Sequence, residues 1–353
     1  MMFDYLKTIR SVSLDFSQYS TSSNREVIVS VGKSGCFMYN SLIGQHPEVR
    51  NLHRLIIVPS ATEADVELLP DIIFSSHPNI TEQSFYACGK LFEFIKENRP
   101  EKITVLLSGG SSALIEKSAD PEKTVRTNEL LLKSGLNILE MNRIRSENSL
   151  IKNGKFAALF PKIIWQIFVM SDIPFKNGEK LVGSMPFFRE DLKNTALFKC
   201  ADSNTLHDQI SSFFENVNSI KNFTGTVNEL ADIIKEFINK KTGNLVISGE
   251  PTLKIDHPSP GSGGRMSHLA LKLLPLIEKS MKLYALSSDG IDGNSGFAGA
   301  VIENVSGNSF NITEIENSLA NYDSAAFLNK YNMTLKSGYT GINLNDFVIL
   351  LRS

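Results

Sequence analysis

Short polar turns that contain glycine, serine and charged residues follow several apolar segments of the chain. Residues 26–31 are followed by Gly32-Lys33-Ser34-Gly35, residues 103–107 by Ser108-Gly109-Gly110-Ser111-Ser112, and residues 163–170 by Ser171-Asp172. Apolar segments of this length are typical of buried strands, and ligands of open parallel sheets bind beyond the carboxyl ends of the strands. The sequence therefore predicts a ligand site at these turns.

The turn of residues 108–112 has the composition of a phosphate cradle. Its two glycines let backbone N–H groups approach an anion, and Ala113-Leu114-Ile115 can begin a helix whose N-terminus favours negative charge. The alternative is a tight strand-to-helix turn that needs glycine for its backbone conformation and binds nothing. The residues of the turn leave both interpretations open.

Lys33 is a candidate cation for a phosphate group. A Walker A loop needs a glycine five residues before its Gly-Lys pair, but that position holds Val27, so the Walker A interpretation fails. What remains is a lysine at the end of a strand, a compact point charge suited to a phosphate oxygen. The alternative is a solvated surface lysine.

Two further turns carry charge in the last third of the chain. Gly261-Ser262-Gly263-Gly264-Arg265 precedes a helix expected over residues 266–280, and an arginine in its first turn opposes the helix dipole, which favours an anion-binding role. Ser288-Asp289-Gly290-Ile291-Asp292-Gly293 presents two carboxylates that can hold Mg²⁺, and Asp172 could add a third as a ligand or a base. The alternative for each aspartate is ordinary turn chemistry.

Composition and charge exclude several classes of protein. The 353 residues include 36 basic and 38 acidic side chains, with no basic stripe, so a nucleic-acid partner is not expected. The first residues resemble no signal peptide, and no apolar segment is long enough to span a membrane, which predicts a cytoplasmic protein without a membrane partner. Three distant cysteines, Cys36, Cys88 and Cys200, are expected to be buried thiols. The sequence leaves the oligomeric state open, with a homodimer as one option.

The spacing of apolar residues predicts a two-domain α/β protein. Strand-like segments alternate with helix-period segments such as residues 81–98, a pattern that favours a doubly wound, mostly parallel sheet. A polar, helix-like stretch leads to Lys240-Lys241-Thr242-Gly243, where the domain boundary is expected. The predicted domains are residues 1–241 and a smaller α/β domain of residues 242–353, with strands at residues 244–248, 283–287 and 346–351.

The order of the motifs along the chain is specific. They include Gly32-Lys33, His77-Pro78, Ser108–Ser112, Asn142-Arg143-Ile144-Arg145 with Ser149 and Lys152, Ser171-Asp172, Ser248-Gly249-Glu250, Gly263-Gly264-Arg265, Ser288–Gly293 and residues 340–346. In this order the motifs resemble the ATP-dependent glycerate 2-kinase family, whose C-terminal part is called the MOFRL domain. The resemblance spans most of the chain.

The resemblance implies a fold, a reaction and a set of site residues. The implied fold is a Rossmann-like N-terminal domain and a smaller MOFRL-like C-terminal domain, with the active site in the cleft between them. The implied reaction is Mg²⁺-dependent and moves the γ-phosphoryl group of ATP to a hydroxyl of a small hydroxy acid. Glycerate is the first expected acceptor. Lys33 and Arg265 would neutralise the transferring group, Asp172 would position or deprotonate the acceptor, and Asp289 or Asp292 would hold the metal. Nucleotide would bind at Ser108, Gly109, Gly110, Ser111, Ser112, Gly263 and Gly264, and phosphate or substrate carboxylate at Asn142, Arg145 and Lys152.

One departure from the family concerns the acceptor. Met266, Ser267 and His268 stand where the family usually has Asn, Gln and Glu, so the pocket is expected to be modified, unless these side chains pack inside the domain or face solvent. A catalytically silent, nucleotide-binding relative is the alternative from another functional class. A hydroxypyruvate reductase is disfavoured, because no strand–GxGxxG–helix unit is present.

Overall fold

Two six-stranded sheets organise the chain. The computed structural model describes residues 3–21, 23, 25–60, 71–240, 243–303, 305 and 310–352. Ser13–Asp202 form one unit, here called the parallel-sheet unit; Met1–Val12 and Ser203–Ser353 form the other, the mixed-sheet unit. No helix within the described ranges is both long and apolar enough to cross a membrane.

The first sheet is entirely parallel. Its strands are β1 (Glu26–Val31), β2 (His53–Pro59), β3 (Ile72–Ser75), β4 (Lys102–Ser108), β5 (Ile164–Ser171) and β6 (Thr195–Asp202). They lie in the order β3-β2-β1-β4-β5-β6, which reverses direction between β1 and β4. This is the order of a doubly wound Rossmann-like sheet, whose ligand crevice lies at the reversal. The predicted fold class is confirmed.

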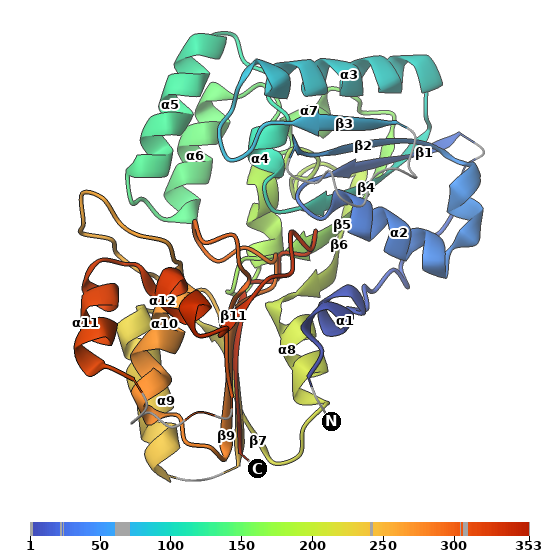
Figure 1. Cartoon of the computed structure of the whole chain (residues 1–353). Helices are drawn as coiled ribbons and strands as arrows, with labels where there is room; N and C mark the ends of the chain where they lie inside the picture. Colours follow the sequence, from blue (N-terminus) through green and yellow to red (C-terminus); the bar gives the residue numbers. More distant parts are fainter. Residues whose placement is uncertain are drawn as a thin grey trace. The chain divides into compact units, whose positions relative to one another are not determined.

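Helices cover both faces of the parallel sheet. They are α2 (Gly35–Gln45), α3 (Glu82–Asn98), α4 (Ser111–Leu114), α5 (Pro121–Lys133), α6 (Ile138–Asn148) and α7 (Lys155–Ala158), with 3₁₀ turns η1 (Pro47–Asn51) and η3 (Gly178–Ser184). The long helix α3 lies on one face and α2 on the other (Figure 1). The helix predicted over residues 81–98 is confirmed: Thr81 and Ser84 cap its start, and Arg99 adopts a left-handed conformation at its end.

Alternating side chains of these strands form the core under α3. Val27, Val29 and Val31 point to the same face and pack with Leu91 of α3 and the buried Trp165 of β5. Strands buried on both faces give nearly continuous apolar segments, which is why the sequence predicted them well.

The second sheet is mixed. Its strands are β7 (Val217–Phe223), β8 (Asn244–Gly249), β9 (Met281–Ser287), β10 (Gly299–Glu303), β11 (Thr334–Leu335) and β12 (Asp346–Arg352). They lie in the order β11-β10-β9-β12-β8-β7, and all pairs are antiparallel except β7 with β8. Strands β8, β9 and β12 correspond to the three strands predicted for this region.

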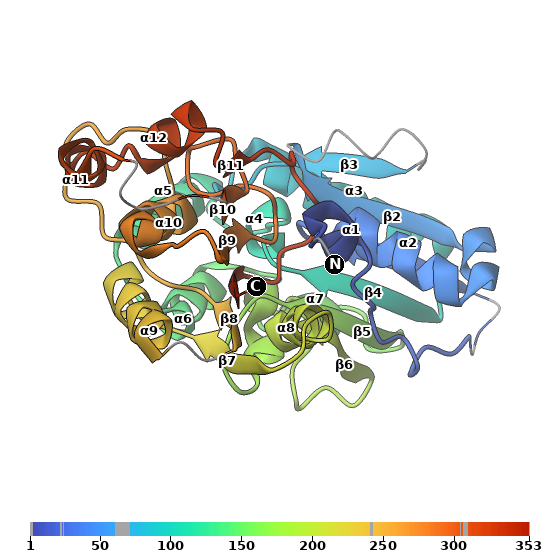
Figure 2. The ribbon, with the colours of Figure 1, turned by 60° about the horizontal axis from the view of Figure 1, so that its bottom comes forward.

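One face of the mixed sheet packs against α9 and α10, and the other packs against α1 and α8 (Figure 2). The helices of this unit are α1 (Tyr5–Arg10), α8 (Ser203–Ser211), α9 (Val227–Lys240), α10 (Arg265–Leu273), α11 (Ile312–Ala320) and α12 (Ser324–Lys330), with the 3₁₀ turn η4 (Leu274–Leu276). Phe3 joins α1 to the sheet through an edge-on contact with Tyr284, with ring centroids 5.2 Å apart. The start of the chain therefore belongs to the unit that contains its end.

The division between the units differs from the sequence-based one. The boundary expected between residues 241 and 242 lies outside the described residues, whereas the contacts divide the chain between Asp202 and Ser203. The reason is pairing: β7 adds to the edge of β8, and α9 packs against α10 in the core of the mixed-sheet unit. Residues 203–240 are thus part of the second unit's sheet and core.

Candidate active site

The turns after β1 and β4 are joined at the point where the parallel sheet reverses direction. The N–H of Lys33 donates to the carbonyl oxygen of Gly109 at 2.8 Å, and the N–H of Ser34 donates to the Ser108 hydroxyl at 3.0 Å. Gly32 has φ of +138° and approaches Ser108 so closely that a Cβ would clash with it. The turn of residues 32–35, here called the Lys33 turn, and the turn of residues 108–112, here called the glycine turn, therefore form one fixed structure at the predicted ligand crevice.

Two predicted catalytic side chains lie against the glycine turn. A Cβ on Gly109 would clash with the carboxylate of Asp172, and a Cβ on Gly110 would lie 3.1 Å from Cγ of Lys33. The absence of side chains at these two positions thus allows a carboxylate and a lysine to approach the same stretch of backbone. The structure brings Lys33, Asp172 and residues 108–112 together, as the sequence predicted.

Helix α6 reaches the same turn through a chain of polar side chains. The hydroxyl of Ser112 lies 2.9 Å from that of Ser184, which donates to Oδ1 of Asn142 at 2.7 Å. Asn142 in turn donates to the carbonyl oxygen of Leu181 at 2.9 Å. Asn142 therefore lies near the turn of residues 108–112, and its polar atoms hold η3 against α6.

Arg145 extends from the same helix into a buried environment. Its Nη2 donates to Oδ1 of Asn128 at 3.2 Å. Burial lowers the pKa of the guanidinium, while the Glu116 carboxylate partly restores it. With a reference pKa far above 7, Arg145 remains a cation at neutral pH.

Lys152 occupies a different position from the one its predicted role requires. Its Nζ forms an ion pair with Glu116, and both side chains are almost completely buried. Ser149 donates to the other carboxylate oxygen of Glu116 at 2.5 Å. Burial lowers the pKa of Lys152, and the Glu116 carboxylate opposes this shift. This geometry is that of an internal ion pair, and Glu116 is a partner that the motif pattern did not indicate.

Arg265 begins α10 in the mixed-sheet unit and is held by two carboxylates. Its Nε donates to Asp346, and its Nη1 lies 3.3 Å from Oε1 of Glu250. Asp346 begins β12 and pairs with Gly249 of β8 and Ser287 of β9, so it lies where those two strands end. Burial lowers the arginine's pKa, but the Asp346 and Glu250 carboxylates together raise it above its ordinary value. Arg265 is thus a fixed, permanently charged group.

Asp346 itself is a buried carboxyl group that the sequence-based set of site residues omitted. Burial raises its pKa to about 7, while the Arg265 cation opposes the rise and the Asp292 carboxylate adds to it. One of its oxygens has no hydrogen-bond partner among the described residues. The only sequence signal for Asp346 was its place at the end of the family-like motif of residues 340–346.

Asp292 caps helix α10. Its two carboxylate oxygens accept hydrogen bonds from the N–H groups of Met266, at 2.9 Å, and Ser267, at 2.7 Å. The side chain is buried, which raises its pKa even though these N–H donors act in the opposite direction. A carboxylate at a helix N-terminus is favoured by the orphan N–H groups and by the helix dipole. Both oxygens of this predicted metal ligand are therefore already engaged by the helix.

Replacing Asp292 by alanine should lower the free energy of unfolding by roughly 2–4 kcal/mol, because two buried N–H groups lose their acceptors. Urea unfolding followed by circular dichroism measures this change. Asp256→Ala, at an exposed position of the same unit, serves as control and should change the value by less than about 0.5 kcal/mol. An Asp292→Ala protein of unchanged stability that needs a higher Mg²⁺ concentration for activity would instead identify Asp292 as a metal ligand.

Asp289 lies on the loop after β9 and is the more available of the two predicted metal ligands. Its Oδ1 accepts hydrogen bonds from the Ser287 hydroxyl and from the N–H of Ile291, both at 3.0 Å. Thr340 holds the loop by donating to the carbonyl oxygen of Ser288 at 2.6 Å. Within the described ranges, no three His, Cys, Asp or Glu side chains are grouped to hold a metal. This donor set fits Mg²⁺ that takes most of its oxygens from phosphates and water, as Mg²⁺ commonly does.

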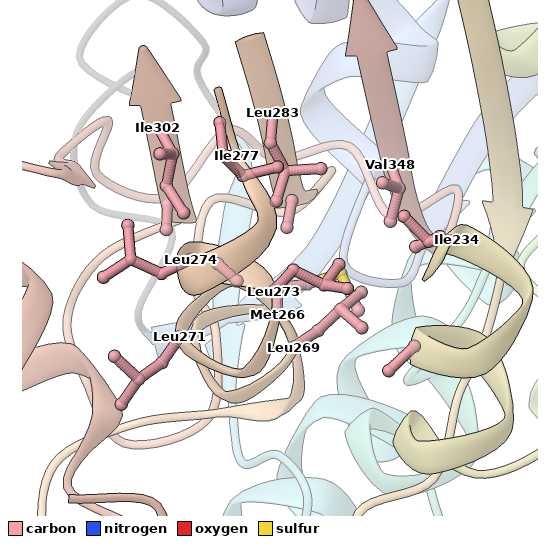
Figure 3. Close-up of a cluster of buried hydrophobic side chains, with 14 of the residues drawn as sticks. Ile234, Met266, Leu269, Leu271, Leu273, Leu274, Ile277, Leu283, Ile302 and Val348 are labelled. Atoms are coloured by element: carbon pink, nitrogen blue, oxygen red, sulfur yellow. The ribbon is translucent and has the colours of Figure 1, made fainter. Parts of the chain in front are cut away.

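The three departures at residues 266–268 all have internal contacts. Met266 is fully buried and lies among Leu269, Leu273 and Ile234 in the hydrophobic core (Figure 3). The Ser267 hydroxyl accepts a hydrogen bond from the N–H of Gly264 at the start of α10. His268 is buried and stacks on Tyr322, with ring centroids 5.7 Å apart. Burial lowers the pKa of His268 to about 4, so this ring is neutral at pH 7. The packing alternative is therefore correct for Met266, and His268 is buried rather than at the surface.

Both parts of the chain match known families. A family model described as a domain of unknown function, DUF4147, matches residues 6–217, and the MOFRL family model matches residues 243–346. The chain is 28% identical to the glycerate 2-kinase of Sulfurisphaera tokodaii, over 92% of this chain and 90% of that protein. It is 25% identical to the glycerate 2-kinase of Picrophilus torridus, over 93% of this chain and 88% of that protein. The crystal structure of glycerate kinase from Thermotoga maritima has the same fold, with a TM-score of 0.82, 21% identity, and coverage of 99% of this chain and 98% of that one.

Proposed function

The chain belongs to the glycerate 2-kinase family, with its DUF4147 and MOFRL domains, and from this premise we propose that it transfers the γ-phosphoryl group of ATP to a hydroxyl of glycerate. The product would be 2-phosphoglycerate. A cytoplasmic location goes with the proposal, because ATP is the phosphoryl donor.

The observation that carries the proposal is the arrangement at the reversal point of the parallel sheet. Lys33 and Asp172 approach the same glycine turn, which offers backbone N–H groups beside a cation and a carboxylate. Phosphoryl transfer depends mainly on positioning and on neutralising the charge of the transferring group. Lys33 would neutralise phosphoryl oxygens, residues 108–112 would hold phosphate, and Asp172 would orient or deprotonate the acceptor hydroxyl.

The mixed-sheet unit supplies the other charged groups of the proposal. Arg265, fixed by Asp346 and Glu250, would bind a phosphate or carboxylate oxygen through the N–H groups that its two partners leave available. Asp289 would contribute an oxygen to Mg²⁺, which neutralises phosphate charge when it is bound with ATP. Gly263 and Gly264 would let the backbone approach the nucleotide.

A direct assay tests the proposed reaction. The purified protein is incubated with Mg²⁺-ATP and a panel of C3 to C6 hydroxy acids, ADP release is followed by a coupled assay, and the product is identified by ³¹P NMR. The proposal predicts ADP release with glycerate, a 2-phosphoglycerate signal and loss of turnover in EDTA. ATP binding without turnover on any acceptor would favour the silent relative, and NADH oxidation with hydroxypyruvate would favour the reductase.

A further inference from the structure

His77 lies at the glycine turn, although its position in the sequence gave it no role in the predicted site. It follows β3 at the carboxyl edge of the parallel sheet, two residues beyond Ser75. A Cβ on Gly110 would lie 2.9 Å from Cδ2 and 3.2 Å from Nε2 of the His77 ring, and 3.1 Å from Cγ of Lys33. The imidazole and the lysine stem therefore pack over the same glycine, which has φ of +86° and no side chain to separate them.

The His77 ring is half-buried and lies in a cationic environment. Burial is the main cause that lowers its pKa, to about 4, and the positive charges of Lys33 and Arg145 lower it further. The ring is therefore neutral at pH 7. A neutral imidazole can donate one N–H hydrogen bond and accept another without adding to the repulsion between the two neighbouring cations.

We propose that His77 contacts an anionic oxygen of the reactants at the Gly110 turn, together with Lys33 and Arg145. The inference rests on the proposed kinase reaction, in which that oxygen belongs either to the carboxylate of the hydroxy acid or to a phosphate of ATP. Lys152, the third member of the anion site that the sequence indicated, is held in its buried pair with Glu116. His77 instead joins Lys33 and Arg145 as the third polar group of the proposed contact, and its side chain differs from lysine in being a neutral donor.

A purely structural role for His77 has a different consequence. If the ring only fills space over Gly110, its removal should lower stability and leave the affinities for both reactants unchanged, apart from any loss of folded protein. A contact with one reactant should change the KM of that reactant and leave the KM of the other nearly unchanged. The two roles are therefore separable by measuring both KM values.

Three variants of His77 and one control distinguish these roles. His77→Ala removes the ring, while His77→Gln and His77→Asn each return a neutral amide donor near one of the two ring nitrogens. His53→Ala is the matched control, because His53 is an exposed histidine that begins β2, at the opposite, amino edge of the same sheet. For each protein, KM for ATP, KM for glycerate and the melting temperature are measured. Calorimetric Kd values for ATP and glycerate are obtained in parallel.

The expected result for His77→Ala is a rise of about ten- to a hundred-fold in KM and Kd for one reactant, the usual size of a lost hydrogen bond to a charged group. One of the two amide variants should recover part of this loss, and His53→Ala should match the unchanged protein. A rise for glycerate assigns the oxygen to the acceptor carboxylate, and a rise for ATP assigns it to a phosphate. Affinities within twofold of the unchanged protein, or equal losses for both reactants that follow the melting temperature, would overturn the inference.

The binding measurements separate this inference from the proposed function. If the unchanged protein binds ATP or glycerate but does not transfer phosphate between them, the kinase proposal fails. A selective loss of binding in His77→Ala would still support the contact. If turnover is normal and no affinity depends on His77, the contact is wrong and the kinase proposal stands.

Discussion

Lys33→Ala is expected to lower kcat/KM for ATP-dependent phosphorylation of glycerate by at least about a hundred-fold, with little change in melting temperature. Removal of one group that stabilises developing charge in a transition state commonly costs roughly 3–4 kcal/mol. The fold should tolerate the change, because the bond that ties this turn to Gly109 comes from the backbone N–H of residue 33, which alanine retains.

A matched lysine separates catalysis from a general loss of positive charge. Lys90 is half-exposed on α3 of the same unit, where it pairs with Glu93, and Lys90→Ala should leave kcat/KM nearly unchanged. Steady-state kinetics and thermal unfolding are measured for both variants. Activity near the unchanged level in Lys33→Ala would remove Lys33 from the site, and a parallel loss of melting temperature would assign it a role in stability.

The strands that the sequence predicted are those buried on both faces. Strands β1, β4 and β5 are nearly continuous runs of apolar residues, which only a buried strand or a buried helix segment explains. Strands β6 and β7 were not predicted, because each lies at the edge of its sheet and carries exposed or half-buried residues, several of them polar. Their pairing partners, and not their own composition, make them strands.

The domain boundary was the least predictable feature for the same reason. Residues 203–240 have a polar, helix-like composition, and it is the pairing of β7 with β8 and the packing of α9 against α10 that place them in the mixed-sheet unit. The first residues join that unit through contacts such as the hydrogen bond from Tyr5 to the carbonyl oxygen of Ser287, at 2.6 Å. These partners are separated by 282 residues, and no local pattern encodes such a contact.

The candidate site was predictable as a set of turns but not as a set of partners. Parallel strands place their carboxyl ends at one edge, so Lys33, Asp172 and the glycine turn could be grouped from the expectation of a parallel sheet alone. Lys152 forms its ion pair with Glu116 across 36 residues of sequence, and Asp292 caps α10 across 25 residues. Both contacts depend on burial and on the folded arrangement of the chain. A charged residue in a motif therefore indicated the region, while its role required the three-dimensional arrangement.

The two-carboxylate clamp on Arg265 makes a lysine at this position a sensitive test. The guanidinium uses Nε for Asp346 and Nη1 for Glu250, and its planar shape directs the remaining N–H groups away from these partners. A lysine has one nitrogen, so it cannot keep both carboxylates and present a separate donor pair to an oxyanion.

Arg265→Lys should therefore lower kcat/KM by roughly a hundred-fold, although the positive charge is retained, because the fork that would bind the reactant is lost. Glu250→Gln, which loosens only the half-exposed side of the clamp, should have a smaller effect of a few-fold. Arg352→Lys is the matched control, because it makes the same substitution at the end of β12 opposite to Asp346. Nη2 of Arg352 donates to the carbonyl oxygen of Ile238, and this variant should keep full activity. Steady-state kinetics and melting temperatures of the three variants distinguish a role in binding the reactant from a role in stability. Full activity in Arg265→Lys would show that only the positive charge is needed at this position. A fall in activity that matches a fall in melting temperature would instead assign the clamp to stability, because a lysine that pairs poorly leaves the buried Asp346 without its partner.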